Sequence, residues 1–165
     1  MKYIIWLNIM KTLVAYYSRT GRTKKIAEAI SNNLGCDIEE IIDTKERSGP
    51  FGYLRSNREA KKKKLTMINS IKNDPSLYDL VIIGTPVWVS TMSSPVRTYI
   101  HQNKNRFKNV AFFCTMGGSD FETTFSQMEE LCEKKPVGSL YVEVMDVLKE
   151  NYADKIKRFI DDIQK

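Results

Sequence analysis

The sequence predicts an α/β fold, with a five-stranded parallel sheet between two layers of helices. Three continuously apolar runs, Leu13–Tyr17, Leu80–Ile83 and Val110–Cys114, are typical of strands buried on both faces. Segments with helical periodicity separate these runs, and this alternation is typical of a parallel sheet with crossover helices. The 165 residues include no linker-like stretch and no repeat, so we expect one domain over residues 1–165.

The segment after the first strand predicts a helix and then a second strand. Ile26 and Ile30 lie on one helical stripe, which favours a helix over Arg22–Leu34 that ends at Gly35. The next segment, Cys36–Ile42, mixes apolar and acidic residues. A strand of this composition is expected near an edge of the sheet.

The second half of the chain continues the alternation. Ser94 and Pro95 are expected to form the N-cap and first position of one helix, and Asp120 the N-cap of the next. Residues 140–144 alternate apolar and polar side chains, as in an edge or half-covered strand. The apolar stripes of the last two helices are Phe121, Phe125, Met128 and Leu131, then Tyr152, Ile156, Phe159, Ile160 and Ile163.

The crossover from residue 44 to 74 is the irregular part of the chain. It contains Gly49-Pro50 and a run of four lysines, Lys61–Lys64. A helix is expected from residue 53 to residue 65. Its candidate inward side chains are Tyr53, Leu54, Ala60 and Leu65. The lysine run is either a solvated face or a docking patch for an acidic partner or anionic substrate.

The amino-terminal stretch MKYIIWLNI is apolar but short. Asn8 and Lys11 interrupt it, and no small-residue cleavage site follows. We interpret residues 1–10 as a short extension before the first strand. Neither a signal peptide nor a membrane span is therefore expected.

The composition is that of an ordinary soluble globular protein, 42% hydrophobic and 28% charged. The 26 Lys and Arg against 20 Asp and Glu give a net charge of +6, which favours acidic partners; no nucleic-acid partner is expected. Cys36, Cys114 and Cys132 are odd in number and form no C-x-x-C pair, and His101 is the only histidine. This pattern favours reduced thiols in the cytoplasm over a disulfide framework, and no metal site is expected.

The end of the first strand predicts an anion-binding loop. The strand runs into Ser18, Thr20, Gly21 and Thr23, and the helical pattern begins at once. Free backbone N–H groups, the helix dipole and nearby hydroxyls all favour a phosphate at such a helix N-terminus. The loop contains neither G-x-x-x-x-G-K-[ST] nor G-x-G-x-x-G, which disfavours a nucleoside triphosphatase and a Rossmann dinucleotide site.

Two later strands also end in unusual loops. TPVW, Thr85–Trp88, follows the third strand, and TMGGSD, Thr115–Asp120, follows the fourth. Ligands of open α/β sheets bind outside the carboxyl ends of the strands, where these three loops would meet. A phosphate loop, an aromatic side chain and a double-glycine loop suit a phosphorylated planar aromatic ligand.

Together these motifs resemble the flavodoxin-like FMN-binding family, over nearly all of Lys11 to Gln164. The signature [ST]-x-T-G-x-T is met by SRTGRT, residues 18–23, and the segments GTPVW, SSPVRTYI and FFCTMGG resemble a short single-domain branch of the family. The resemblance implies a flavodoxin-like three-layer sandwich with strand order 2-1-3-4-5. It also implies FMN as the cofactor.

The resemblance further implies which residues contact the cofactor. Contacts to the FMN phosphate are expected from Ser18, Arg19, Thr20, Gly21, Arg22 and Thr23. Contacts to the isoalloxazine ring are expected from Thr85, Pro86, Val87, Trp88, Thr115, Met116, Gly117 and Gly118. The alternatives are a core position for Trp88 and a plain turn at Gly117-Gly118.

Three features depart from the better-known flavodoxins. Arg19 and Arg22 add cations to the phosphate loop, where they either bind the phosphate or point to solvent. The segment Thr85–Pro95 has no glycine, which makes a positive φ beside the ring costlier by on the order of 1 kcal/mol. The sequence pI near 9.2 favours acidic redox partners such as ferredoxin-like proteins, or anionic small molecules.

These observations favour an electron-transfer protein that carries electrons between redox partners, with no catalytic side chain of its own. The alternative is an NAD(P)H- or quinone-dependent FMN reductase, in which Arg55, Arg58 or the lysines bind an anionic nucleotide. A response-regulator receiver shares the topology but needs carboxylates at the end of the first strand. This chain has YYSRTG there, so a receiver is disfavoured.

Overall fold

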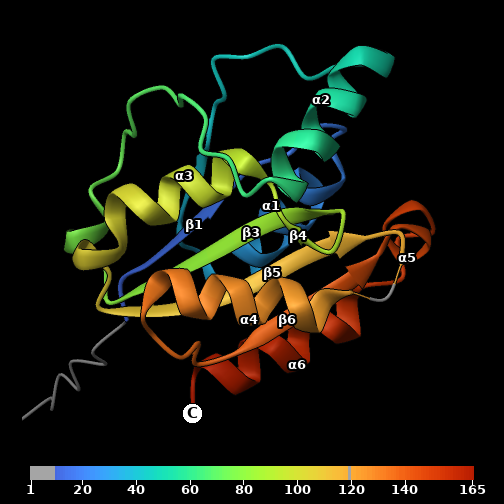
Figure 1. The fold of residues 1–165 in the computed structure, drawn as a ribbon. Coiled ribbons are helices and arrows are strands. Elements are labelled where there is room, and N and C mark those ends of the chain that lie inside the picture. Colours follow the sequence, from blue (N-terminus) through green and yellow to red (C-terminus); the bar gives the residue numbers. More distant parts are fainter. Residues whose placement is uncertain (1–9, 119) are drawn as a thin grey trace, which may run out of the picture.

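A computed structural model describes residues 10–118 and 120–165 of the chain. Its strands are β1 (Thr12–Tyr16), β2 (Asp37–Glu40), β3 (Leu80–Trp88), β4 (Thr91–Met92), β5 (Asn109–Met116) and β6 (Ser139–Glu143). Five parallel strands form the sheet in the order β2-β1-β3-β5-β6, and β4 pairs antiparallel with the end of β3 (Figure 1). Apart from β4, this confirms the predicted order 2-1-3-4-5.

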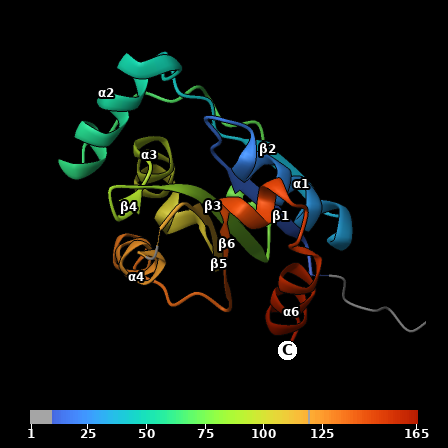
Figure 2. The ribbon, with the colours of Figure 1, turned by 90° about the vertical axis from the view of Figure 1, so that its right-hand side faces the viewer.

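Helices cover both faces of the sheet, which gives the predicted three layers (Figure 2). On one face lie α1 (Arg22–Leu34), α5 (Val144–Leu148) and α6 (Ala153–Ile163). On the other face lie α3 (Ser94–Asn103) and α4 (Phe121–Cys132), with α2 (Gly49–Lys61) outside α3. The two short 3-10 turns are Pro75–Leu77 and Lys104–Arg106.

The apolar strands are buried on both faces, as their composition predicts. In β1, Leu13 and Ala15 enter the core beneath α3 and α4, whereas Val14 and Tyr16 enter the core beneath α1 and α6. The two central neighbours, β3 and β5, divide their side chains between the same two cores. Because successive strand residues point to opposite faces, a strand with helices on both sides needs an apolar residue at every position.

Strand β3 is longer than its apolar run. It continues through Pro86 to Trp88 and turns back as β4, so the TPVW segment forms part of a hairpin. The prediction that residues 85–88 form a loop after the strand is therefore wrong. Gly84 and Pro86 interrupt the apolar pattern, but they do not end the strand. Helix α3 begins one residue earlier than predicted, at Ser94, with Ser93 at the N-cap.

Helix α2 differs most from its prediction. It begins at Gly49, where Pro50 fits the first turn, and it ends at Lys61. Of the expected inward residues only Ala60 is buried, since Tyr53, Leu54 and Leu65 are 51%, 63% and 47% exposed. The buried positions of the helix are Gly52, Ser56 and Ala60. The inward face is thus made of small residues, which a search for apolar periodicity does not detect.

Strands β3 and β5 approach closely at a glycine. Gly84 pairs in register with Phe113, and a Cβ at Gly84 would lie 2.0 Å from Phe113 Cζ. Real Cβ atoms do not come so near, so the aromatic ring occupies the space that a side chain would need. This contact lies one residue before the TPVW segment and sets how closely β3 and β5 approach where that segment begins.

No helix among the described residues is long and apolar enough to cross a bilayer. The extension predicted for residues 1–10 stays a prediction, because residues 1–9 lie outside the described part of the chain.

We expect Gly84→Ala to lower the free energy of unfolding by about 1–3 kcal/mol, because the added methyl group overpacks the contact with Phe113. Urea denaturation measures this loss. The double variant Gly84→Ala/Phe113→Leu frees space for the methyl group, so its loss should be smaller than the sum of the two single losses. Strictly additive losses would contradict the proposed steric conflict.

Candidate functional site

The SRTGRT loop connects β1 to α1 at the carboxyl edge of the sheet. Gly21 is the N-cap of α1 with φ 83°, a left-handed conformation that glycine adopts without a steric penalty. No side chain caps the first N–H groups of α1, and its first turn contains no acidic residue. The positive end of the helix dipole is therefore available to an anion.

Two polar atoms of this loop are buried without a hydrogen-bond partner among the described residues: Ser18 Oγ and Arg19 Nη1. Buried polar atoms nearly always have partners, so an orphaned pair needs an explanation. A hydroxyl and a guanidinium N–H are both donors to phosphate oxygens. Their position at an uncapped helix N-terminus fits a phosphate group.

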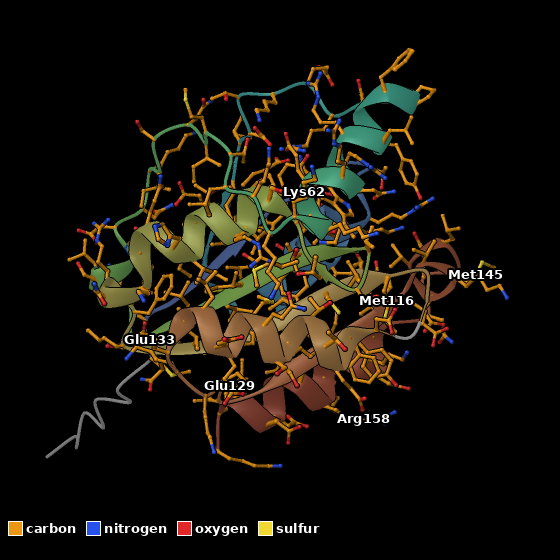
Figure 3. All side chains as sticks on the ribbon, viewed as in Figure 1. Lys62, Met116, Glu129, Glu133, Met145 and Arg158 are labelled. Atoms are coloured by element: carbon orange, nitrogen blue, oxygen red, sulfur yellow. The ribbon has the colours of Figure 1, made fainter. Side chains whose placement is uncertain are left out.

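A cavity of about 500 Å³ adjoins the loop and brings the three predicted segments together. The predicted residues that line it are Arg19, Thr20, Arg22, Thr23, Pro86, Val87, Trp88, Thr115, Met116 and Gly117. Ser18, Gly21, Thr85 and Gly118 are predicted residues that do not line it. The lining contains two arginines and no carboxylate, so its electrostatics favour an anionic ligand. Met116 marks the β5 end in Figure 3.

Thr85, which is predicted to contact the ring, is not among the residues that line the cavity. It is fully buried, and its Oγ1 accepts a hydrogen bond from the Ser93 backbone N–H at 3.0 Å. The side chain thus caps the start of α3 and does not face the cavity. Gly117 and Gly118 are both exposed, and a Cβ at either would meet no atom within 4 Å. This open space is compatible with a plain turn and with close approach of a ligand.

Hydroxyl groups join the first and third segments at the floor of the cavity. Thr23 Oγ1 and Thr115 Oγ1 are 2.7 Å apart and buried, and either can be the donor. The neighbouring Cys114 is fully buried, and this burial raises the pKa of its thiol to about 12. Cys114 therefore stays protonated at neutral pH and has the structural role expected for it.

Helix α2 supplies a wall that the sequence did not predict. Tyr53 and Asn57 line the cavity from this helix, and Val89 and Val144 complete the set of lining residues. The Arg19 guanidinium carbon lies 4.9 Å from the Tyr53 ring centroid and 5.4 Å from the Trp88 ring centroid. Arg19 therefore contacts two aromatic rings, a cation–π arrangement that stabilises its position at the mouth of the loop.

Trp88 is both a core residue and a cavity residue. It is 4% exposed and packs edge-on against Tyr17, with the ring centroids 5.6 Å apart. A second guanidinium, that of Arg47, lies 5.5 Å from its ring. The alternatives of a core position and a ligand contact thus do not exclude each other.

Arg47 anchors α2 through a buried group of charges. Its side chain is 2% exposed and forms ion pairs with Asp43 and with Glu59, the latter at 2.7 Å. Burial alone would lower the pKa of Arg47, but the hydrogen bonds that its guanidinium donates to both carboxylates outweigh this effect, and the pKa is raised. For Glu59, burial alone would raise the pKa. The hydrogen bonds that it accepts from Arg47 and Lys45 outweigh this effect, and the pKa is lowered. Arg47 and Glu59 are therefore both charged at neutral pH.

The tip of the β3–β4 hairpin is strained. Val89 and Ser90 form its two-residue turn with φ of 50° and 60°, where asparagine and glycine are the usual residues. Ser90 Oγ donates a hydrogen bond of 2.6 Å to Asp120 Oδ2, which ties the turn to the start of α4. Asp120 is the N-cap residue as expected, but its carboxylate holds the hairpin and does not cap the helix.

The fold is that of a doubly wound α/β protein, and its cavity at the carboxyl edge of the sheet has a lining that suits an anionic ligand. Comparison with known proteins is more specific, because a family model described as Flavodoxin matches residues 11–160. The chain therefore belongs to the flavodoxin family, a family of FMN proteins. No curated protein sequence matches the chain.

Solved structures of bacterial flavoproteins are similar to this one. A flavoprotein from Lactobacillus acidophilus, solved in complex with FMN, is 27% identical with a TM-score of 0.68, over 87% of this chain and 99% of that one. A candidate flavoprotein from Bacteroides uniformis is 21% identical with a TM-score of 0.75, over 92% of this chain and 98% of that one. The second likeness is one of fold alone.

We expect Arg47→Met to lower the free energy of unfolding by about 3–5 kcal/mol, because it leaves buried carboxylates without a counter-charge. Chemical denaturation measures this loss. The matched control is Lys45→Met, which removes a half-exposed partner of Glu59 and should cost less than about 1 kcal/mol. Equal losses in the two variants would show that Arg47 is not the anchor of α2.

Proposed function

We propose that the cavity binds FMN and that the protein carries electrons between redox partners. The observation that supports this most strongly is the meeting of an orphaned Ser18 Oγ and Arg19 Nη1 with an uncapped helix N-terminus, beside an aromatic-walled cavity. The SRTGRT loop would hold the phosphate, and the TPVW hairpin and the loop after β5 would hold the ring. The relative from Lactobacillus acidophilus, whose structure contains FMN, supports the same assignment.

The residues of this chain bind and shield the cofactor. Ser18, Arg19 and the N–H groups of α1 hold the phosphate, and the Arg19 charge partly neutralises it. Trp88 and Tyr53 cover apolar surface of the ring and exclude water from it. FMN supplies the electron-accepting chemistry when bound, so no acid or base is required from the protein.

The predicted partner is an acidic redox protein of the ferredoxin type, because the chain is basic. We place the protein in the cytoplasm. Cys36, Cys114 and Cys132 are all free thiols in the structure, which agrees with a reducing compartment.

An FMN reductase remains the second candidate. A second cavity, of about 450 Å³, is lined by Arg55, Arg58, Lys62 and Lys64 together with Leu54 and Glu59. Its cations suit the phosphates of a nicotinamide nucleotide.

The cofactor assignment is tested with FMN and riboflavin, which share the ring but differ in the phosphate. We expect Ser18→Ala to weaken FMN binding by about tenfold, equivalent to about 1.4 kcal/mol, and to change riboflavin binding less than about twofold. Quenching of flavin fluorescence gives both dissociation constants. Ser126→Ala, an exposed serine on α4, is the control. A wild-type protein that shows no flavin absorption after incubation with FMN and desalting would refute the assignment.

The choice between carrier and reductase is tested by two rates on the FMN-loaded protein. We expect rapid one-electron exchange with an acidic [2Fe–2S] ferredoxin in stopped-flow mixing, and negligible steady-state NAD(P)H oxidation with a quinone as acceptor. The physical reason is that an electron carrier needs only contact between its partner and the edge of the flavin ring, whereas a reductase must also bind the nicotinamide nucleotide. Sustained NAD(P)H turnover with slow ferredoxin exchange would favour the reductase.

A further inference from the structure

The net positive charge of this protein comes mainly from one segment. Residues 49–64, which are α2 and the turn after it, contain Arg55, Arg58 and Lys61–Lys64 against the single carboxylate Glu59. This segment of 16 residues therefore carries a net +5, and the other 149 residues together carry +1. The basic character that favours an acidic partner belongs to α2 and not to the surface in general.

The cations of residues 49–64 are clustered and uncompensated. None of the six forms an ion pair with residues 10–118 or 120–165. On other elements, several cations are paired with carboxylates, for example Lys25 with Glu150 and Lys155 with Asp146, and the unpaired ones are interspersed with these pairs and with acidic residues. The one carboxylate of the segment, Glu59, is itself bound by Arg47 and Lys45. A partner thus meets unscreened positive charge on this helix.

The lysine run does not wind around a helix, as a continuous helix over residues 53–65 would require. Helix α2 ends at Lys61, and Lys63 adopts φ 51°. The Lys63 and Lys64 N–H groups donate to the carbonyls of Ala60 and Glu59, which is a Schellman C-cap. Cations at a helix C-terminus stabilise the helix through its dipole. This effect explains the lysines near the last turn of α2, but it does not explain Arg55, which lies further from the C-terminus.

The same helix exposes large apolar side chains between its charges. Phe51 is 86% exposed and Leu54 is 63% exposed, and Met67 on the following segment is 72% exposed. Apolar side chains rimmed by uncompensated charge are typical of protein–protein contact surfaces. Figures 1 and 2 show α2 at the outside of the molecule, beyond α3.

This surface adjoins the cofactor cavity. Tyr53 and Asn57 line the cavity from one side of α2, while Leu54 and Arg58 belong to the outer side of the same helix. The buried Arg47 ion pairs fix the helix against the rest of the protein. A protein docked on the outer side would hold its redox centre near the cavity without occupying it.

We propose that the outer side of α2, formed by Phe51, Leu54, Arg55, Arg58, Lys62 and Lys64, is the docking surface for an acidic redox protein. The proposal rests on the proposed electron-transfer function and adds where the partner binds. The partner presents carboxylates around a small apolar patch beside its redox centre. Charge attraction accelerates the encounter, and burial of Phe51 and Leu54 prolongs the complex.

The test uses two variants with the same change of net charge. The first is Arg55→Gln/Arg58→Gln/Lys62→Gln/Lys64→Gln. The matched control is Lys135→Gln/Lys149→Gln/Lys157→Gln/Arg158→Gln, which removes four exposed cations without an ion pair among the described residues. Figure 3 shows Arg158 on α6, across the molecule from α2. Both variants lower the net charge from +6 to +2.

Binding of an immobilised acidic [2Fe–2S] ferredoxin to each apoprotein is measured by surface plasmon resonance at low and high salt. We expect the association rate of the α2 variant to fall by about tenfold at low salt and its salt dependence to flatten. The control variant should remain within about twofold of wild type. A third variant, Phe51→Ser, should raise the dissociation rate at both salt concentrations.

Several outcomes would overturn the proposal. Equal losses in both four-site variants would mean that net charge alone steers the partner. No loss in the α2 variant would place docking elsewhere. Displacement of the ferredoxin by NADPH would identify a nucleotide site, and tighter binding of wild type to anionic phosphatidylserine vesicles than to ferredoxin would identify a lipid surface.

The use of apoprotein separates this proposal from the cofactor assignment. Failure to bind FMN with normal ferredoxin docking would refute the proposed function alone. Normal FMN binding in all variants, with docking unaffected by the α2 changes, would refute the docking surface alone.

Discussion

The buried ion pairs of Arg47 are the interaction on which the arrangement of the site depends. Helix α2 has little apolar surface to bury, and its inward face is made of Gly52, Ser56 and Ala60. Such a helix gains little from the hydrophobic effect, so its position is set by charges that must remain paired once buried. Arg47 also lies against Trp88, which couples the helix to the cavity wall.

The cavity itself follows from the parallel sheet. Because the carboxyl ends of β1, β3 and β5 meet at one edge, three segments far apart in the sequence contribute to a single site. The contact of Gly84 with Phe113 brings β3 and β5 close together just before the TPVW segment, and the bond between Ser90 and Asp120 holds the hairpin at the end of β3. The positive φ values of Val89 and Ser90 are maintained by this attachment.

Charge and structure assign different tasks to the two sides of α2. The side that faces the cavity offers an aromatic ring and an amide, which suit a bound planar ligand. The outer side presents Arg55, Arg58, Lys62 and Lys64, and it exposes Phe51 and Leu54. Long-range attraction and short-range contact are thus provided by one rigid element, next to the cavity and outside it.

The sequence by itself determined the fold class, the strand order implied by its motifs, the bounds of α1 and the three segments that line the cavity. The strand order was implied by the resemblance to the flavodoxin-like family, whereas the other features are encoded locally, by apolar runs, by helical stripes and by a glycine and hydroxyls at a strand end. Only the tertiary structure decided the position of α2, the lining by Tyr53 and Asn57, the hairpin after Pro86 and the inward turn of Thr85. Each of these depends on a partner distant in the chain: Arg47 contacts Glu59 and Trp88, and Thr85 bonds to Ser93. Periodicity reports which face of an element is apolar, but it does not report which distant charge or hydroxyl that element will meet.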